Sequence, residues 1–227
     1  MTDPHRTDHR NTTAPTTIFF PGLGADSTLA KYHSVPGKSL WIEWPPVIPD
    51  NWDDFADLLA RQIPSTEPLR FVGVSFGGLA ALKTAQRLPP EGGVFLVGSL
   101  TGRAEIRWPL RALLPLVRWV PTPLFDLQHL PQWLVRHFFG IRESSHMKDF
   151  SAMASRLPPR SVKALCTLVA QWQPVCAPIA GRIHGKHDRI IHPAPLEVTM
   201  VDGGHLLSMT NAAEVNRWLN FPLESGH

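Results

Sequence analysis

The feature that most constrains the fold is an alternation of short apolar runs with longer segments of helical periodicity. The apolar runs, each five or six residues long, are residues 16–20, 39–44, 69–74, 93–97, 179–184 and 196–201. Residues 51–63, 78–88 and 211–219 instead carry apolar side chains at helical spacing. Such alternation is typical of βαβ units. We therefore expect an α/β fold with a mostly parallel sheet flanked by helices.

This pattern is interrupted between residues 99 and 178, where no strand is indicated and Pro, Trp, Leu and Phe are frequent. The interruption is far longer than an ordinary connection between a strand and a helix, so it should have structure of its own. We expect a helical insertion at residues 101–175 within a core formed by residues 16–100 and 176–227. Residues 1–15 are polar and turn-rich, which predicts a disordered tail.

Composition excludes several classes of protein. A chain of 227 residues with 43% hydrophobic residues can bury one sizeable core. The formal net charge of +3 comes without a dense basic run, which argues against a nucleic-acid partner. The most apolar late stretch, residues 110–125, is interrupted by Arg111, Arg118 and prolines, so no membrane span is expected. The start of the chain has no apolar stretch of the kind a secretory signal needs, which predicts a cytoplasmic protein.

The chain has only two cysteines, Cys166 and Cys176, and both fall in a stretch with a helical pattern. Two cysteines do not make a disulfide framework of the kind that small secreted domains use. We expect reduced, buried thiols.

The strongest chemical signal is Gly-Val-Ser-Phe-Gly at residues 73–77, between an apolar run and a helical segment. A serine at such a turn takes a strained backbone conformation that lifts its hydroxyl clear of the sheet. The neighbouring backbones then approach closely, which explains Gly73 and Gly77. Ser75 is therefore the candidate nucleophile, and a serine that merely caps the helix is the alternative.

A glycine-rich turn, Pro21-Gly22-Leu23-Gly24, follows the first apolar run. It lacks the lysine and hydroxyl of a P-loop, and its glycine spacing differs from the dinucleotide fingerprint. Such a turn can aim a backbone N–H at a developing oxyanion. We assign one donor to Leu23 and the second to Phe76, which begins the helix after Ser75.

A serine nucleophile needs a histidine as base and a carboxylate that orients the histidine. His205 follows two glycines in the loop after the last apolar run, and Asp188 lies in the loop after the run before it. The order Ser75, Asp188, His205 is the one expected for a serine hydrolase built on a parallel α/β sheet. Asp188 could otherwise be a turn residue.

A metal site is a competing possibility, raised by His184, His187, Asp188, His192 and His205. Their spacing across a strand end and a Pro-containing loop argues against it, because it differs from a helical motif that sets ligands on one face. We expect neither a metal nor another cofactor.

Taken together, GVSFGG, FFPGLG, IHGKHD and DGGHLL resemble the α/β-hydrolase superfamily, from about residue 16 to the end and outside the insertion. The resemblance implies a parallel core sheet, with the insertion after the sixth family strand acting as a cap over the site. Pro21 stands where the family often has His, which leaves the Leu23 amide available. The first run begins too late for the two leading family strands, so a minimal, six-stranded sheet is expected.

These residues predict hydrolysis of a carboxylic ester of a small to medium apolar substrate through an acyl-enzyme. A thioesterase, a carbon–carbon bond hydrolase and a non-catalytic ligand-binding protein are the alternatives. The residue pattern leaves the oligomeric state open. Some aromatic side chains of the insertion should contact substrate, because pockets are lined mainly by apolar groups. The candidates are Trp108, Trp119 and Trp133.

Overall fold

The centre of the molecule is a six-stranded sheet in a computed structural model that describes residues 15–64, 68–194 and 197–221. Every neighbouring pair of strands is parallel, and the strand order is β2-β1-β3-β4-β5-β6. The strands are β1 (Thr16–Phe20), β2 (Ser39–Trp41), β3 (Leu69–Val74), β4 (Val94–Val97), β5 (Ile179–Gly185) and β6 (Thr199–Val201). The predicted six-stranded parallel sheet is thus confirmed.

The two edge strands are shorter than the sequence pattern indicated, whereas β1 and β3 have the expected bounds. β2 ends at Trp41 instead of residue 44, and β6 begins at Thr199 instead of residue 196, which lies outside the described residues. Each edge strand pairs on one side only. The hydrophobic pattern extends further than the pairing because it reports burial rather than hydrogen bonding.

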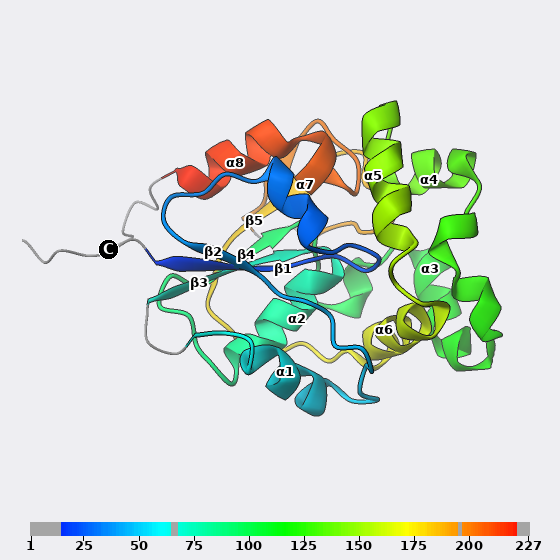
Figure 1. The fold of residues 1–227 in the computed structure, drawn as a ribbon, viewed down its shortest axis with the longest axis horizontal. Coiled ribbons are helices and arrows are strands. Elements are labelled where there is room, and N and C mark those ends of the chain that lie inside the picture. Colours follow the sequence, from blue (N-terminus) through cyan, green and yellow to red (C-terminus); the bar gives the residue numbers. More distant parts are fainter. Residues whose placement is uncertain (1–14, 65–67, 195–196, 222–227) are drawn as a thin grey trace, which may run out of the picture.

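Helices cover both faces of the sheet (Figure 1). α1 (Trp52–Ala60) and α2 (Phe76–Ala85) pack on one face, and η1 (Ser27–Tyr32), α7 (Leu207–Thr210) and α8 (Ala212–Asn220) lie on the other. Burial from both sides explains why β4 is a continuous apolar run rather than an alternating one.

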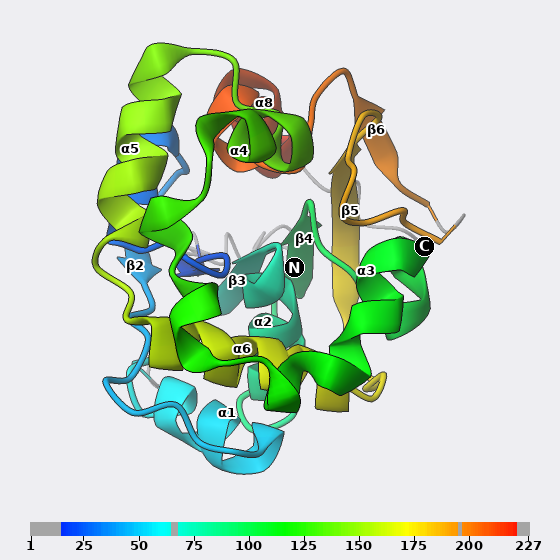
Figure 2. The same ribbon diagram turned by 90° about the vertical axis from the view of Figure 1, so that its right-hand side faces the viewer.

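The chain between β4 and β5 forms a layer of short helices that we call the cap (residues 101–175). Several of its helices carry proline in their first turn, where the missing N–H is not needed. In Figure 2 the cap lies nearest the viewer, in front of the ends of β3 and β4. Its elements are η2 (Arg103–Glu105), α3 (Trp108–Leu113), η3 (Leu114–Trp119), η4 (Thr122–Phe125), η5 (Leu127–His129), α4 (Gln132–Phe139), α5 (Ser144–Ala154) and α6 (Pro159–Gln171).

The two cysteines have different environments. Cys166 lies in α6, and burial raises the pKa of its thiol to about 12. Cys176 is exposed, so the expectation that both thiols are buried in a helix is wrong for Cys176. The helix ends at Gln171 because the chain turns extended at Trp172, and Pro174 then has no N–H to donate to a further turn.

The expected disordered tail falls almost wholly outside the described residues, which begin at Pro15. Within the described ranges, every helix is too short or too polar to cross a lipid bilayer.

Candidate active site

Ser75 lies at the sharp turn between β3 and α2. Its backbone angles are φ 50° and ψ −119°, and it is the only residue other than glycine with positive φ in the described ranges. This conformation costs energy, and the surroundings must hold it in place. The Ser75 amide donates to the Val97 carbonyl at 3.0 Å, and its own carbonyl accepts from the Ser99 hydroxyl at 2.6 Å. The strained peptide is therefore anchored on both sides.

The glycines that flank Ser75 are needed because other backbones approach them. A Cβ at Gly77 would lie 2.0 Å from the Phe20 carbonyl oxygen, and one at Gly73 would lie 2.3 Å from the Gly78 Cα. The end of β1 thus packs directly on the first turn of α2. This contact brings the turn after β1 next to the serine.

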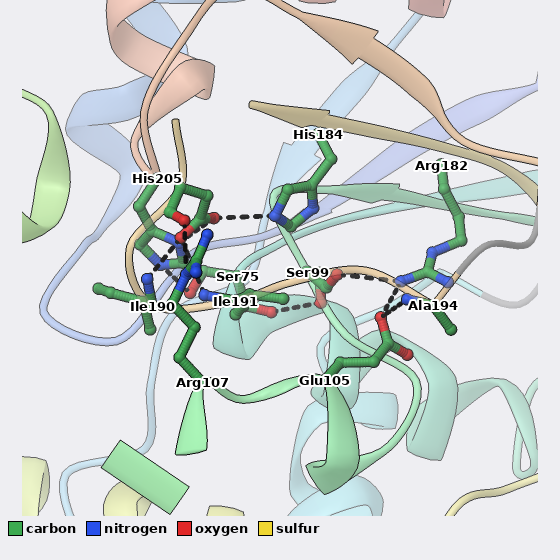
Figure 3. Close-up of polar contacts among 11 residues, drawn as sticks. Ser75, Ser99, Glu105, Arg107, Arg182, His184, Ile190, Ile191, Ala194 and His205 are labelled. Carbon is green, nitrogen blue, oxygen red and sulfur yellow. Dashed lines mark hydrogen bonds and ion pairs between the residues drawn. The ribbon is translucent and has the colours of Figure 1, made fainter. Parts of the chain in front are cut away.

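His205 joins Ser75 to Asp188. Its Nε2 lies 2.8 Å from the Ser75 Oγ, and its Nδ1 lies 2.8 Å from the Asp188 Oδ2. The histidine follows β6 and the aspartate follows β5, so the three residues come from loops at the carboxyl ends of parallel strands. Figure 3 shows the His205 ring directed at Ser75. The three residues chosen from the sequence therefore form one hydrogen-bonded chain.

Ser75 lines an apolar cavity of about 420 Å³ between the sheet and the cap. Among the described residues, its only side chains that carry a hydroxyl, thiol or ring nitrogen are those of Ser75, Cys166 and His205. The cap supplies apolar lining residues from α3, η3, η4, α4, α5 and α6, namely Leu110, Leu113, Leu114, Val117, Phe125, Phe139, Phe150, Met153 and Val169.

Leu23 and Phe76, the two residues expected to bind an oxyanion, line the same cavity. Phe76 is the first residue of α2, so its amide has no acceptor within the helix. The Leu23 turn lies against the serine, because a Cβ at Gly22 would be 3.5 Å from the Ser75 Cβ. The structure thus brings both candidate residues to the serine.

Comparison with known proteins places the chain in a family. A model described as the alpha/beta hydrolase family matches residues 14–218. The chain belongs to this family. No curated protein matches this α/β hydrolase in sequence.

Solved structures share its fold at low sequence identity. A lipase-esterase related protein from Clostridium acetobutylicum is 14% identical with a TM-score of 0.64, over 92% of this chain and 95% of that protein. An esterase from Exiguobacterium antarcticum is 12% identical with a TM-score of 0.64, over 94% and 93%. YbtT, a type II thioesterase from the yersiniabactin biosynthetic pathway, is 17% identical with a TM-score of 0.58, over 92% and 93%. At these identities the likeness establishes the fold alone.

The carboxylate of Asp188 is held on both oxygens in the α/β hydrolase. Its Oδ1 accepts from the amides of Ile190 at 2.7 Å and Ile191 at 2.9 Å, and its backbone carbonyl accepts from the Arg107 Nε of the cap at 2.9 Å. Burial by itself raises the pKa of Asp188. The nearby His205, together with hydrogen bonds to the carboxylate, outweighs burial and holds that pKa well below its ordinary value. Asp188 is therefore ionised at neutral pH.

A second histidine touches the same carboxylate, and sequence reasoning missed this role. The Nε2 of His184, a buried residue near the end of β5, lies 2.9 Å from the Asp188 Oδ2 (Figure 3). In the sequence, His184 stands four residues before Asp188, and this spacing indicates only a candidate metal ligand. Within the described residues, no group of three or more His, Cys, Asp or Glu side chains is placed to hold a metal ion.

A buried ion pair contacts Ser99, the residue whose hydroxyl holds the Ser75 carbonyl. No sequence motif indicated this pair. Arg182 of β5 pairs with Glu105 of the cap, and the Arg182 Nη2 also lies 3.4 Å from the Ser99 carbonyl (Figure 3). Glu105 further accepts from the Ala194 amide at 3.2 Å. Since Ser99 holds the Ser75 carbonyl, the pair connects the cap to the strained turn.

Trp108, Trp119 and Trp133 do not lie in the apolar cavity, contrary to the expectation that they contact substrate. These residues are 74%, 73% and 68% exposed. The inward positions of the same segments are filled by leucine, valine and phenylalanine instead. The helices of the cap are short, so tryptophan rings on their outer side cannot turn inward without displacing those residues.

Proposed function

We propose that this α/β hydrolase cleaves carboxylic esters of small to medium apolar substrates through an acyl-enzyme. The observation that carries the proposal is the chain of contacts from Ser75 through His205 to Asp188, which ends in an apolar cavity. A cavity of about 420 Å³ is near the lower end of the range for small-molecule sites.

The geometry supports a two-step reaction. The Ser75 Oγ attacks the ester carbonyl carbon while His205 Nε2 accepts the hydroxyl proton, and the alcohol leaves with that proton. Water then attacks the acyl-enzyme, His205 again accepts a proton, and the carboxylic acid leaves as the Ser75 hydroxyl is restored. Asp188 keeps the His205 proton on Nδ1, so Nε2 is free to act as base.

The amides of Leu23 and Phe76 stabilise the oxyanion in this proposal. The N-terminal end of α2 adds its positive dipole end at the same place. Both amides belong to rigid backbone, because the glycine contacts at Gly77 pack the two turns together. Preorganised donors of this kind need no rearrangement as negative charge develops.

Labelling with a fluorophosphonate probe tests the serine mechanism. The intact protein should be labelled, Ser75→Ala should not, and Ser155→Ala should behave as the intact protein because Ser155 is an exposed residue of the cap. If the intact protein is not labelled, or Ser75→Ala is labelled equally, the proposal fails and a non-catalytic ligand-binding role becomes the better explanation.

The acyl and leaving groups are tested with matched substrates. We expect hydrolysis of nitrophenyl esters from acetate to octanoate, with kcat/KM highest for an acyl chain that fills the cavity. Thioesters of the same acids follow the same steps, so the ratio of ester to thioester rates decides between an esterase and a thioesterase. Faster turnover of every thioester than of its ester would contradict the ester assignment.

A further inference from the structure

The cap is strongly basic although the whole chain is not. Residues 101–175 contain ten Lys or Arg against four Asp or Glu, whereas the rest of the chain contains twelve against fifteen. The cap therefore has a formal charge of +6 and the remainder −3. Such an asymmetry produces a positive field on one side of the molecule.

Little of this positive charge is neutralised within the protein. Among the described residues, Arg156 is the only Lys or Arg of the cap that forms an ion pair, with Asp26 of the core. Five others donate to backbone carbonyls, which leave their charge in place. These are Arg103, Arg107, Arg111, Arg136 and Lys163.

The acidic residues of the cap do not offset those cations, because most already have partners of their own. Glu105 pairs with Arg182, and Asp149 pairs with Lys31 at 2.6 Å, both partners being core residues. Asp126 lies 2.8 Å from His129. The unpaired charge of the cap is therefore positive.

The same segment exposes an unusual amount of apolar surface. Leu113, Leu116 and Leu124 are each more than half exposed, as are the three tryptophans at positions 108, 119 and 133. The tryptophans alone expose on the order of 400 Å², since a whole aromatic side chain offers about 150–250 Å². The cap is therefore a candidate interaction surface, since large exposed apolar patches on soluble proteins mark interaction sites.

Apolar and basic groups alternate along α3 and η3. Trp108, Leu113 and Leu116 are interspersed with Arg111 and Arg118, and the Arg118 guanidinium lies 5.0 Å above the Trp119 ring. α3 and α4 both lie on the side that faces the viewer in Figure 2. Tryptophan prefers the boundary between lipid and water, and arginine binds anionic headgroups while its stem contacts the acyl region.

We propose that the outer face of the cap is a docking surface for a bilayer that contains anionic phospholipid. Contact between two caps would bring together two surfaces of the same charge, which disfavours a second copy of the chain as the occupant. An anionic bilayer satisfies both the positive charge and the exposed tryptophans. No helix need cross the membrane for such binding.

Docking in this way would place the apolar cavity beside the lipid. Leu113 is exposed and also lines the cavity, and its neighbours Leu110, Leu114 and Val117 on the same two elements line it as well. Apolar substrates dissolved in a membrane could then reach Ser75 without crossing water. The docking proposal itself does not depend on turnover and is tested without it.

Vesicle binding provides the test, with the full chain carrying Ser75→Ala so that no lipid is consumed. Co-sedimentation should show binding to vesicles of phosphatidylglycerol and phosphatidylcholine, weak binding to phosphatidylcholine alone, and a decrease as salt is added. Lipids brominated in the acyl chain should quench part of the tryptophan fluorescence on binding.

Matched variants locate the surface. Arg111→Gln with Arg118→Gln should weaken partitioning into anionic vesicles roughly fivefold for each charge removed. Arg61→Gln with Lys186→Gln, two exposed basic residues outside the cap, should leave it unchanged. Replacing the three exposed tryptophans with Ala should weaken binding by at least about tenfold. The same change at Val47, Met200 and Phe221 should not, although these are exposed apolar residues of the core.

Several results would overturn the proposal. Equal binding to neutral and anionic vesicles would show that anionic headgroups are not recognised. Equal losses in the cap variants and their controls would show that the cap is not the binding surface. If the protein binds neither kind of vesicle, the outer face of the cap would instead be assigned to a protein partner. A concentration-dependent dimer that the tryptophan variant abolishes, without vesicle binding, would assign it to a second copy.

Discussion

Replacing Asp188 with Asn exchanges one carboxylate oxygen for an NH₂ group, and the contacts of the carboxylate determine how the new amide must sit. One oxygen accepts from the amides of Ile190 and Ile191, and the other faces His205 and His184. The remaining side-chain oxygen must keep the first position, because an NH₂ group there would face two N–H donors. The NH₂ group then faces both imidazole rings.

This orientation inverts the tautomer of His205. Its Nδ1 becomes an acceptor, so the ring proton moves to Nε2, which lies 2.8 Å from the Ser75 Oγ. A protonated Nε2 cannot take the serine proton. The equivalent change in a serine protease lowers kcat about 10⁴-fold, so we expect a loss of that order here, or about 5.5 kcal/mol of transition-state stabilisation.

Steady-state hydrolysis of nitrophenyl butyrate gives the loss in kcat, and urea unfolding shows whether the variant is folded. Asp202→Asn is the matched control, because Asp202 is an exposed aspartate of the neighbouring loop whose partner is His187. We expect the control to retain its activity. A folded Asp188→Asn protein with less than about a tenfold loss would refute the assigned role and show that another group orients His205.

The pH dependence of stability follows with a definite sign. The pKa of Asp188 is lower in the folded protein than its unfolded value of about 3.9, so the ionised carboxylate stabilises the fold above that pH. This contribution is lost as the pH falls through the folded pKa. The stability difference between the intact protein and Asp188→Asn should therefore narrow as the pH is lowered below about 4.

Three further predictions concern neighbouring groups. His184→Leu removes the imidazole nitrogen that lies 2.9 Å from the Asp188 carboxylate and should lower kcat/KM about tenfold, whereas His184→Gln, which keeps a polar group near the carboxylate, should do less. Equal effects of Leu and Gln would make His184 a packing residue only. Glu105→Gln removes the anion that pairs with the buried Arg182, whose Nε and Nη1 have no partner among the described residues. The change should lower the free energy of unfolding in urea by about 3–5 kcal/mol, and a loss below about 1 kcal/mol would contradict the pairing. Leu114→Ala enlarges the cavity and should lower kcat/KM for octanoate more than for acetate by about 1–2 kcal/mol, whereas the exposed Leu124→Ala should change both alike.

The core of the fold could be predicted from the sequence because its signals are local. A strand that is covered on both faces must be apolar throughout, as β3 and β4 are, and a helix must repeat its apolar positions every three or four residues. Ser75 was recognisable for a related reason. Its strained turn requires glycines at fixed positions in the chain. The close approach of neighbouring backbones is therefore visible in the sequence as a short motif.

The supporting residues of the site could not be predicted in this way. Arg182 and Glu105 are 77 positions apart and meet only because β5 packs beside the start of the cap. Ser99 and His184 are ordinary residues at strand ends until the parallel sheet aligns them with Ser75 and Asp188. No local pattern distinguishes a buried polar residue with a distant partner from one exposed to water.

The cap shows most clearly which features the sequence determines and which depend on the tertiary structure. The sequence determined that this segment is helical, broken by prolines, rich in large apolar residues and positively charged. It also determined the order of Ser75, Asp188 and His205 in the loops that follow three strands. Which side of each cap helix faces Ser75 was decided only by packing, since short helices can turn either side inward at similar cost until neighbouring helices restrict them. In the folded protein leucines line the cavity and Trp108, Trp119 and Trp133 face solvent, because the cavity they would fill is already closed by other cap residues.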